Sequence, residues 1–189
     1  MKRLFRFFVC IFWMTYSVDG LSLIDGQFVF GRRFIRSHDK TKELDISGWE
    51  SLAALHVDPW PLVPVSFGGS YSNTSISSGF SYELLESYLH EFDIEASAWV
   101  PLILFTPYLK LRIPVWSKFY IAPKDDTNHK IIDTTVSGFH VHLGIAFNII
   151  PYASFLIEVG RSIEEINNFY EKDREFNAYF IGAGLQVAF

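Results

Sequence analysis

Hydrophobic and polar residues alternate along much of the chain, most clearly at its C-terminal end. From Tyr179 to Phe189 every second residue is hydrophobic, and the residues between them, from Phe180 to Ala188, include two glycines and a glutamine. A period of two is the signature of a β-strand, in which successive side chains point to opposite faces. The chain is therefore predicted to end in a strand with one apolar face.

The same alternation predicts seven further strands. They cover residues 27–36, 50–57, 63–71, 91–100, 108–115, 138–148 and 153–160. The connections between them are short at 58–60, 101–106 and 149–151 and longer and polar at 37–44, 72–88, 117–135 and 162–175. Bacterial outer-membrane barrels have short periplasmic turns, longer outer loops and an even number of strands. The sequence thus predicts an all-β fold, an eight-stranded antiparallel up-and-down transmembrane barrel.

Four residues depart from this regular pattern. Arg32 and Arg33 fall on opposite faces of the first strand, so one of them is expected at a rim or a bulge. Pro64 and Pro114 fall within predicted strands, where each removes a ladder hydrogen bond, and a bulge is expected to accommodate them.

Parity alone does not decide which face looks outward, because a soluble barrel would enclose its apolar face around a ligand. The polar faces carry most of the strand glycines, namely Gly68, Gly138, Gly144, Gly160, Gly182 and Gly184. A narrow interior needs small residues, whereas a lipid-facing surface does not. Aromatic residues also lie near the strand ends, as the girdles of membrane barrels do. They are Trp60, Phe105, Tyr108 and Tyr152 by the short turns, and Trp49, Tyr71, Trp116, Phe119, Tyr120, Tyr170 and Tyr179 by the long loops.

The N-terminus has the order of a secretory signal peptide. Lys2, Arg3 and Arg6 are followed by an apolar run to Met14 and then by small or turn-forming residues. The run is too short to span a bilayer as a helix. We expect cleavage after Gly20, or alternatively after Ser17, which gives a signal peptide over residues 1–20 and a barrel domain over residues 21–189.

Composition agrees with a sheet that has one apolar and one polar face. The chain is 49% hydrophobic, 17% aromatic and 20% charged, and Cys10 is its only cysteine. Removing residues 1–20 leaves 13 Lys plus Arg against 20 Asp plus Glu, a formal charge of 13 − 20 = −7. This balance gives no support to a nucleic-acid partner. After residue 20 no run of eighteen apolar residues occurs, so a membrane role must rest on strands.

The C-terminal residues resemble the β-signal of outer-membrane proteins, a glycine followed by hydrophobic residues at the third and fifth positions, the last usually Phe. Gly184, Val187 and Phe189 match it, whereas Gly182 stands where the pattern has a polar residue. In size and rhythm of connections, residues 21–189 resemble small barrels of the OmpA, OmpX and OmpW kind. The resemblance implies location in the bacterial outer membrane, contact with its lipid, and insertion by the outer-membrane assembly machinery.

Charged residues gather on the face assigned to the interior. Symmetric pairing across the short turns sets Trp99 opposite Tyr108, Ser97 opposite Lys110 and Glu95 opposite Arg112, with Asp93 diagonal to Arg112. It also sets Asn148 opposite Tyr152 and His142 opposite Glu158. The predicted interior network is Asp93, Glu95, Lys110, Arg112, His140, His142 and Glu158. It forms either an ion path or a plug of ion pairs, and the narrow interior of an eight-stranded barrel favours the plug.

No cofactor, metal site or enzyme is expected. The two predicted interior histidines, His140 and His142, are on the wrong face for a lipid-modifying serine hydrolase, and no serine joins them near the outer rim. The outer loops are candidates for a surface ligand, since 72–88 mixes small polar and aromatic residues.

A further alternative is a narrow channel for small solutes, or for hydrophobic molecules that leave sideways through the wall. The latter requires an interior that is apolar near its outer mouth.

Overall fold

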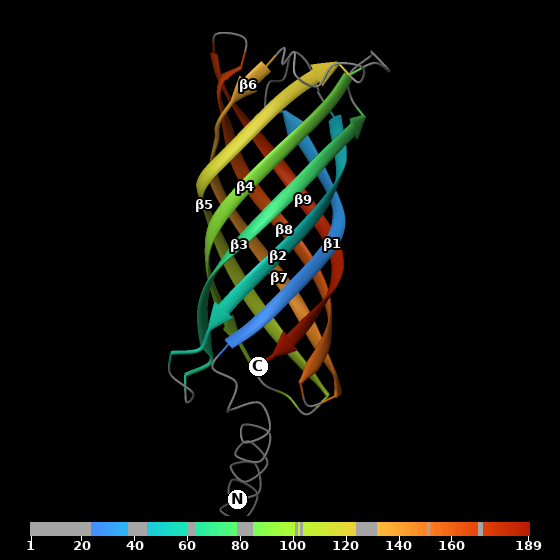
Figure 1. Cartoon of the computed structure of the whole chain (residues 1–189), viewed down its shortest axis with the longest axis vertical. Coiled ribbons are helices and arrows are strands. Elements are labelled where there is room, and N and C mark those ends of the chain that lie inside the picture. The colour runs from blue at the N-terminus through green and yellow to red at the C-terminus, as the bar shows by residue number, and fades with distance from the viewer. Residues whose placement is uncertain are drawn as a thin grey trace, which may run out of the picture.

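The computed structural model of the chain describes residues 24–37, 45–59, 63–78, 85–100, 102, 104–123, 132–150, 152–169 and 172–189. Nine strands lie in these ranges (Figure 1). They are β1 (Ile24–Ser37), β2 (Asp45–Val57), β3 (Val65–Ser78), β4 (Leu85–Trp99), β5 (Phe105–Pro123), β6 (Ile132–Thr134), β7 (Val136–Ile150), β8 (Ala153–Phe169) and β9 (Lys172–Ala188). Because Thr135 alone separates β6 from β7, these two occupy one position in the wall. The predicted signal peptide lies outside the described residues and stays a prediction.

The sheet closes on itself. Every neighbouring pair of strands is antiparallel, in the order β4-β3-β2-β1-β9-β8-β7-β5-β6, and a further pairing of β4 with β5 joins the two ends. The last strand pairs with nearly all of the first, from Asp25 opposite Ala188 to Ser37 opposite Phe176. The predicted eight-stranded antiparallel barrel is confirmed. Among the described residues, no helix is long and apolar enough to cross a membrane.

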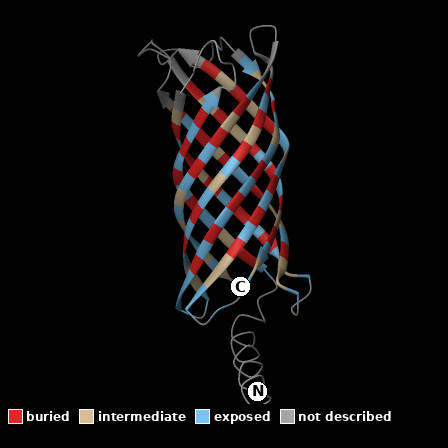
Figure 2. Cartoon of the chain, turned by 180° about the vertical axis from the view of Figure 1, so that it is seen from behind, coloured by how far each residue is buried: buried red, intermediate tan, exposed pale blue. Residues whose placement is uncertain are grey.

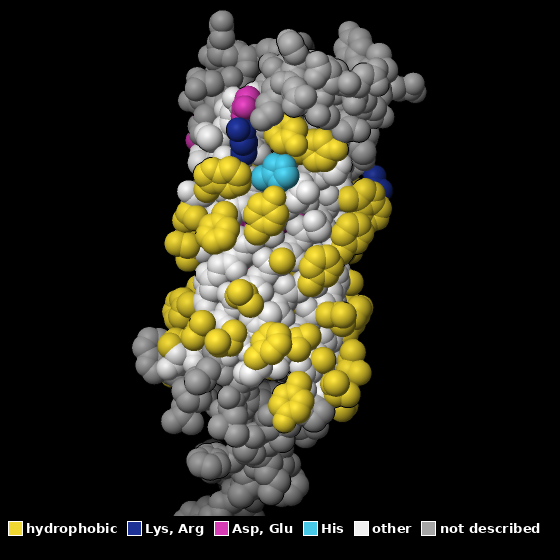
Figure 3. All heavy atoms as spheres, in the orientation of Figure 1, with side chains coloured by type: hydrophobic (Ala, Val, Ile, Leu, Met, Phe, Trp, Pro, Cys, Tyr) yellow, Lys and Arg dark blue, Asp and Glu magenta, His cyan; other side chains and the backbone are white. Residues whose placement is uncertain are grey.

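The barrel is apolar outside and polar inside over most of its height. Buried and exposed residues alternate along each strand (Figure 2). Large hydrophobic side chains such as Phe28, Leu55 and Leu143 point outward and are more than half exposed. On the face seen in Figure 3, hydrophobic side chains cover the wall, and charged ones appear only toward the end opposite both termini. A soluble barrel would show the reverse, so the interpretation of a membrane barrel agrees with this surface.

The interior glycines make room for large interior side chains. A Cβ on Gly144 would lie 2.2 Å from Cζ of Tyr108, and one on Gly160 would lie 2.8 Å from Cε1 of His142. Both contacts are closer than real Cβ atoms come. The small residues that the sequence places on the polar face therefore leave space for the opposing tyrosine and histidine.

Three outer connections are shorter than predicted. The loops expected at 72–88, 117–135 and 162–175 contain the outer parts of β3, β4, β5, β6, β8 and β9. These predictions are wrong in extent because the outward positions of these strand segments are not consistently hydrophobic. Beyond the membrane an outward position no longer needs to be apolar, and residues such as Ser75 and Glu165 point outward instead. These parts of the expected loops extend the wall of the barrel.

Pro114 does sit at a bulge, as expected. Asp93 pairs with Pro114, but Phe92 pairs with Trp116, which leaves Val115 as an extra residue. Val115 and Trp116 are consecutive and both are exposed, so the parity of β5 reverses here. Pro64 lies before β3 begins, so its placement within a strand was wrong. No bulge interrupts β1 at Arg32 and Arg33, because its register with β2 and β9 is continuous there, with Arg33 pointing into the barrel and Arg32 outward.

Most of the predicted girdle residues that the structure describes point outward. Trp49, Tyr71, Trp116 and Tyr179 are exposed toward the outer end, and Phe105 and Tyr152 toward the turns. Tyr108 and Phe119 are buried in the interior instead. Tyr108 belongs to the polar face, and the reversal at Val115 turns Phe119 inward. Trp60 and Tyr170 lie outside the described residues.

Candidate functional site

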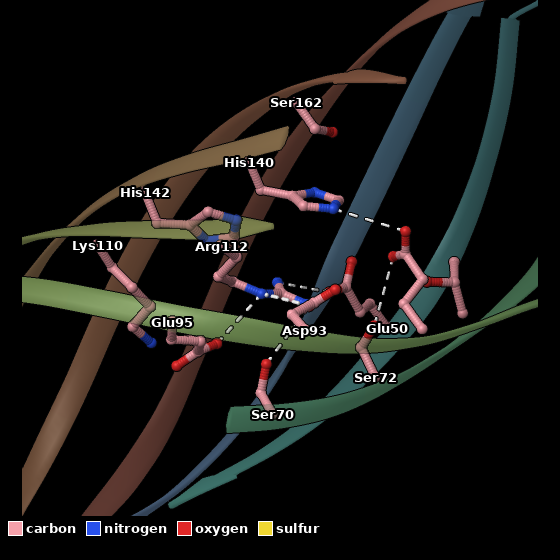
Figure 4. A network of polar contacts seen from close by, with 12 residues as sticks. Glu50, Ser70, Ser72, Asp93, Glu95, Lys110, Arg112, His140, His142 and Ser162 are labelled. Carbon is pink, nitrogen blue, oxygen red and sulfur yellow. Dashed lines mark hydrogen bonds and ion pairs between the residues drawn. The ribbon is translucent and has the colours of Figure 1, made fainter. Parts of the chain in front are cut away.

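All seven predicted network residues point into the barrel and are buried, with exposures of 0 to 3%. They come from four neighbouring strands of the wall. Asp93 and Glu95 lie on β4, Lys110 and Arg112 on β5, His140 and His142 on β7, and Glu158 on β8. Since successive inward residues are two apart, each strand places its pair one above the other. Figure 4 shows six of these side chains converging in the interior.

The lower part of the network is organised around Glu158. Lys110 Nζ donates to Glu158 Oε2 at 3.1 Å, and Tyr108 Oη donates to the same oxygen at 2.8 Å. Nδ1 of His142 lies 2.5 Å from the other oxygen, Oε1. The ammonium group of Lys110 also donates to Gln27 Oε1 at 2.9 Å. This single carboxylate therefore connects β5, β7 and β8.

Arg112 is surrounded by carboxylates. Its Nε donates to Asp93 Oδ2 at 2.9 Å and lies 3.2 Å from Glu95 Oε1, while its Nη1 donates to Glu50 Oε1 at 3.3 Å (Figure 4). Below it, Nε2 of His56 lies 2.6 Å from Glu95 Oε2, and Nδ1 of His56 lies 3.1 Å from Asp25 Oδ1.

A second arginine, which the sequence did not assign to the network, occupies the level above. Arg33 Nη1 donates to Glu91 Oε2 at 2.8 Å and lies 3.4 Å from Glu50 Oε2, and its Nη2 pairs with Glu164. The imidazole of His140 lies between Glu91 and Glu164, at 3.5 and 3.7 Å. Parity would have found Arg33, Glu50 and Glu91, because each lies on the polar face of a strand. Glu164 lay in a predicted loop.

The two arginines share Glu50. One of its oxygens faces Arg33 and the other faces Arg112, and its side chain is 3% exposed. The network therefore runs without interruption from β1 through β2 and β4 to β5 and β8. Charges this deeply buried must be paired, since an unpaired one is very costly.

The predicted register is right at one turn and wrong at the other. Trp99 faces Tyr108, Ser97 faces Lys110 and Glu95 faces Arg112, as expected. Asn148 faces Ser154 instead of Tyr152, and Glu158 faces Gly144 instead of His142. The register shifts between Asn148 and Ile150, where β7 runs on almost to the turn. His142 still reaches Glu158 diagonally.

Negative charge exceeds positive charge around the two arginines. Among the described residues, the carboxylates Glu50, Glu91, Asp93, Glu95 and Glu164 form their arginine ion pairs with two guanidinium groups, those of Arg33 and Arg112. Glu91, Asp93 and His140 bring potential metal-ligand atoms within 4.8 Å of one another. Their ligand types suit a divalent cation. Because Arg33 and Arg112 already hold the two carboxylates, a cation would have to compete with both.

Apolar side chains fill the interior at other heights. An outer cluster lies beyond Arg33, and an inner cluster lies on the side of the short turns. The outer cluster is Ile35, Ile76, Leu89, Phe119, Ile121, Val136, Ile166, Phe176 and Ala178. The inner cluster is Val29, Leu52, Ala54, Tyr108, Ala146, Leu156 and Phe180, with Trp99 packed against it. The interior thus holds a buried charge network with an apolar layer toward the outer end.

The residues of the C-terminal signal lie where β9 closes the barrel. A Cβ on Gly184 would lie 2.1 Å from the carbonyl oxygen of Phe28, so the two strands pack too closely for a side chain there. Val187 and Phe189 point outward, and the amide of Phe189 donates to the carbonyl of Ile24 at 2.9 Å. Their recognition by the assembly machinery stays a prediction.

Solved structures with the same architecture support this description. Neisserial surface protein A is 13% identical, with a TM-score of 0.70 over 89% of this chain and 98% of that chain. The chain has the fold of the small outer-membrane β-barrels. The outer membrane protein OprG from Pseudomonas aeruginosa (12% identity, TM-score 0.51, 89% and 97% covered) and the outer membrane protein AlkL (8%, 0.51, 89% and 90%) share this fold.

No protein-family model matches the chain, and no curated protein is significantly similar in sequence. The fold and the apolar outward wall together place this barrel in the outer membrane of a Gram-negative bacterium. The expectation that it is not an enzyme stays a prediction.

We predict that Arg33→Ala destabilises the barrel by about 3–5 kcal/mol, because it leaves Glu50, Glu91 and Glu164 buried without their common partner. Arg32→Ala is the matched control. It removes an exposed arginine from the adjacent position, and we expect a loss of no more than about 1 kcal/mol. Unfolding by guanidinium chloride in detergent micelles, followed by tryptophan fluorescence, measures both. Equal losses in the two variants would contradict the structural role of Arg33.

Asp58, in the turn between β2 and β3, gives a pH-dependent prediction. Burial and the nearby Asp25 raise the pKa of its carboxyl to about 6, and its Oδ1 has no hydrogen-bond partner among the described residues. The folded protein then binds a proton more tightly than the unfolded chain, so this group costs stability as the pH rises from about 4 to 6. Asp58→Asn should stabilise the barrel at pH 8 and have little effect at pH 4. Unfolding curves at the two pH values test this, and an equal effect at both would refute it.

Proposed function

We propose that this protein is a sealed outer-membrane barrel with a structural or surface-interaction role, and that it does not conduct ions along its axis. The observation that carries the proposal is the pair of arginines that cross the interior. Arg33 connects β1 to β2, β4 and β8, and Arg112 connects β5 to β2 and β4. An eight-stranded barrel is just wide enough for side chains to fill it.

The outer apolar cluster reinforces this closure. An ion that passed the arginines would next meet Ile76, Leu89 and Phe119, all at most 5% exposed. Among the described residues, the outer cluster lines this part of the interior with apolar side chains. With the axis closed, the parts of the molecule left for contact with other molecules are its outer end and its wall, which favours a role at the cell surface.

Single-channel recording in planar bilayers tests the proposal. We expect the folded wild-type protein to give no steady, discrete openings, because both the charge network and the outer cluster lie across the axis. A positive control is Leu89→Gly with Phe119→Gly and Arg33→Gly, which removes side chains from both layers and should raise the conductance if this variant folds. Regular openings of the wild type would refute the sealed barrel.

A second function, passage of small apolar molecules sideways through the wall, is favoured by the wall itself. β5 and β7 pair from Phe105 opposite Phe147 to Arg112 opposite His140. Pairing of β5 resumes with β6 only at Phe119 opposite Thr134. Between these points the ladder is interrupted, and one side chain bridges it, with Ser117 Oγ accepting from the amide of Val136 at 2.6 Å.

This interruption lies beside the apolar part of the interior. Phe119 and Val136, which flank it, both belong to the outer cluster. A channel for hydrophobic molecules requires an interior that is apolar near its outer mouth, and the outer cluster meets this requirement. A molecule that entered from outside would be stopped by the charges of Arg112 and His140, so its way out would lead between β5 and β7 into the lipid.

A disulfide between β5 and β7 across the interruption distinguishes this second function from the sealed barrel. Ser117→Cys with Val136→Cys should, once oxidised, slow uptake of an apolar fluorescent probe into vesicles that carry the protein, and reduction should restore it. The control pair, Leu111→Cys with Val141→Cys, lies directly opposite in the intact ladder and should have no effect. Uptake no faster than in protein-free vesicles would exclude this function and leave the sealed barrel.

A further inference from the structure

Two arginines point outward from the wall, each among aromatic side chains. Arg32 on β1 and Arg161 on β8 are both exposed. Each lies eight residues from the start of its strand, at Ile24 and Ala153, which corresponds to about 26 Å along the strand and about 20 Å along the tilted barrel axis. The apolar band of such barrels is about 25 Å tall. Both arginines therefore lie near its outer edge, at the headgroups of the outer leaflet.

The two arginines bracket a row of aromatic residues. Arg161 faces Tyr179 on β9, and Tyr179 faces Phe34 on β1, two residues from Arg32. The Arg32 guanidinium carbon lies 5.6 Å from the centroid of Phe34 and 5.5 Å from that of Trp49, and the Arg161 guanidinium carbon lies 5.9 Å from that of Tyr179. One strand separates β1 from β8, so the two backbones are about 10 Å apart. A single headgroup can reach both guanidinium groups.

The stacking and one hydrogen bond orient each arginine and leave most of its donors available. Arg32 Nη2 donates to Ser47 Oγ at 3.0 Å, and Arg161 Nη2 donates to Asn177 Oδ1 at 3.1 Å. Neither forms an ion pair with a carboxylate that the structure describes. Glu165, the next outward carboxylate described on β8, lies four residues farther toward the outer end. A cation at a lipid interface that has no acidic partner among the described residues is placed for an anionic lipid group.

We propose that Arg32 and Arg161, with Tyr179, Phe34 and Trp49, form a binding site for the phosphorylated sugar headgroup of an outer-leaflet glycolipid. The planar guanidinium fork matches phosphate oxygens with two parallel hydrogen bonds. The aromatic rings between the arginines offer apolar faces for the sugar and the upper acyl chains. The site lies on the lipid-facing wall and is independent of whether the interior is sealed.

Binding of purified lipid A to the folded protein tests the site. In detergent micelles, native mass spectrometry should show one bound bisphosphorylated lipid A, with its affinity reduced about fivefold by Arg32→Gln or Arg161→Gln alone and more by both together. Lys118→Gln is the matched control. Lys118 is a partly exposed cation on β5 that pairs with Asp133 at 3.4 Å, and its loss should leave the affinity unchanged.

Two further ligands, lipid A without its phosphates and inorganic phosphate, identify the chemical group that the site recognises. Lipid A without its phosphates should bind weakly to the wild type and to both variants alike, and inorganic phosphate should not compete at millimolar concentration, because it lacks the acyl chains. Heat-dependent migration on gels confirms that each variant is folded, and the single variants serve if the double one does not fold. Equal affinity of wild type and Arg→Gln variants, or an equal loss with Lys118→Gln, would overturn the proposal.

Discussion

The structure depends on the pairing of buried guanidinium groups with carboxylates from other strands. Arg33 and Arg112 lie in the narrow interior with side-chain exposures of 2% and 1%, and Glu50 connects them. A membrane barrel must turn its apolar side chains toward lipid, so its interior is left to polar groups that water barely reaches. The cost of burying those charges is met only when each has a partner of opposite sign. The glycines beside Tyr108 and His142 serve the same end, because they allow large polar side chains to meet in the centre.

The wall obeys a different constraint, that of backbone hydrogen bonding in lipid. Unpaired amides and carbonyls are costly in the bilayer, and closure of β1 on β9 removes both sheet edges. The interruption between β5 and β7 is the exception among the described strands. It coincides with the extra residue at Val115, since β5 advances seven residues from Arg112 to Phe119 where the other side advances six between His140 and Thr134. The place where the wall is weakest is thus also the place where β5 reverses its parity.

Much of this could be predicted from the alternation of residue types, because period-two parity fixes which side chains share a face. It placed Asp93, Glu95, Lys110, Arg112, His140, His142 and Glu158 in the interior, and it set Glu95 opposite Arg112. It missed Arg33 because two adjacent arginines on opposite faces seemed to break the alternation. Arg33 is in fact an interior charge, and Arg32 points outward. It missed Glu164 because outer strand segments lose their apolar residues where they leave the lipid. The offset of Glu158 from His142 could not be foreseen, since a bulge near a turn leaves no mark on parity.

The position of Glu164 has a consequence for the order in which the barrel assembles. Arg33 belongs to the first strand, and its partners on β2 and β4 belong to the same half of the chain. Its remaining partner lies on β8 and reaches it only once the C-terminal strands have come round to meet the first. Until then a carboxylate and part of a guanidinium group face a space that is being closed to water. The ion pair between Arg33 and Glu164 therefore forms only at the final step. It stabilises the fully closed barrel over any partly formed sheet and makes closure cooperative.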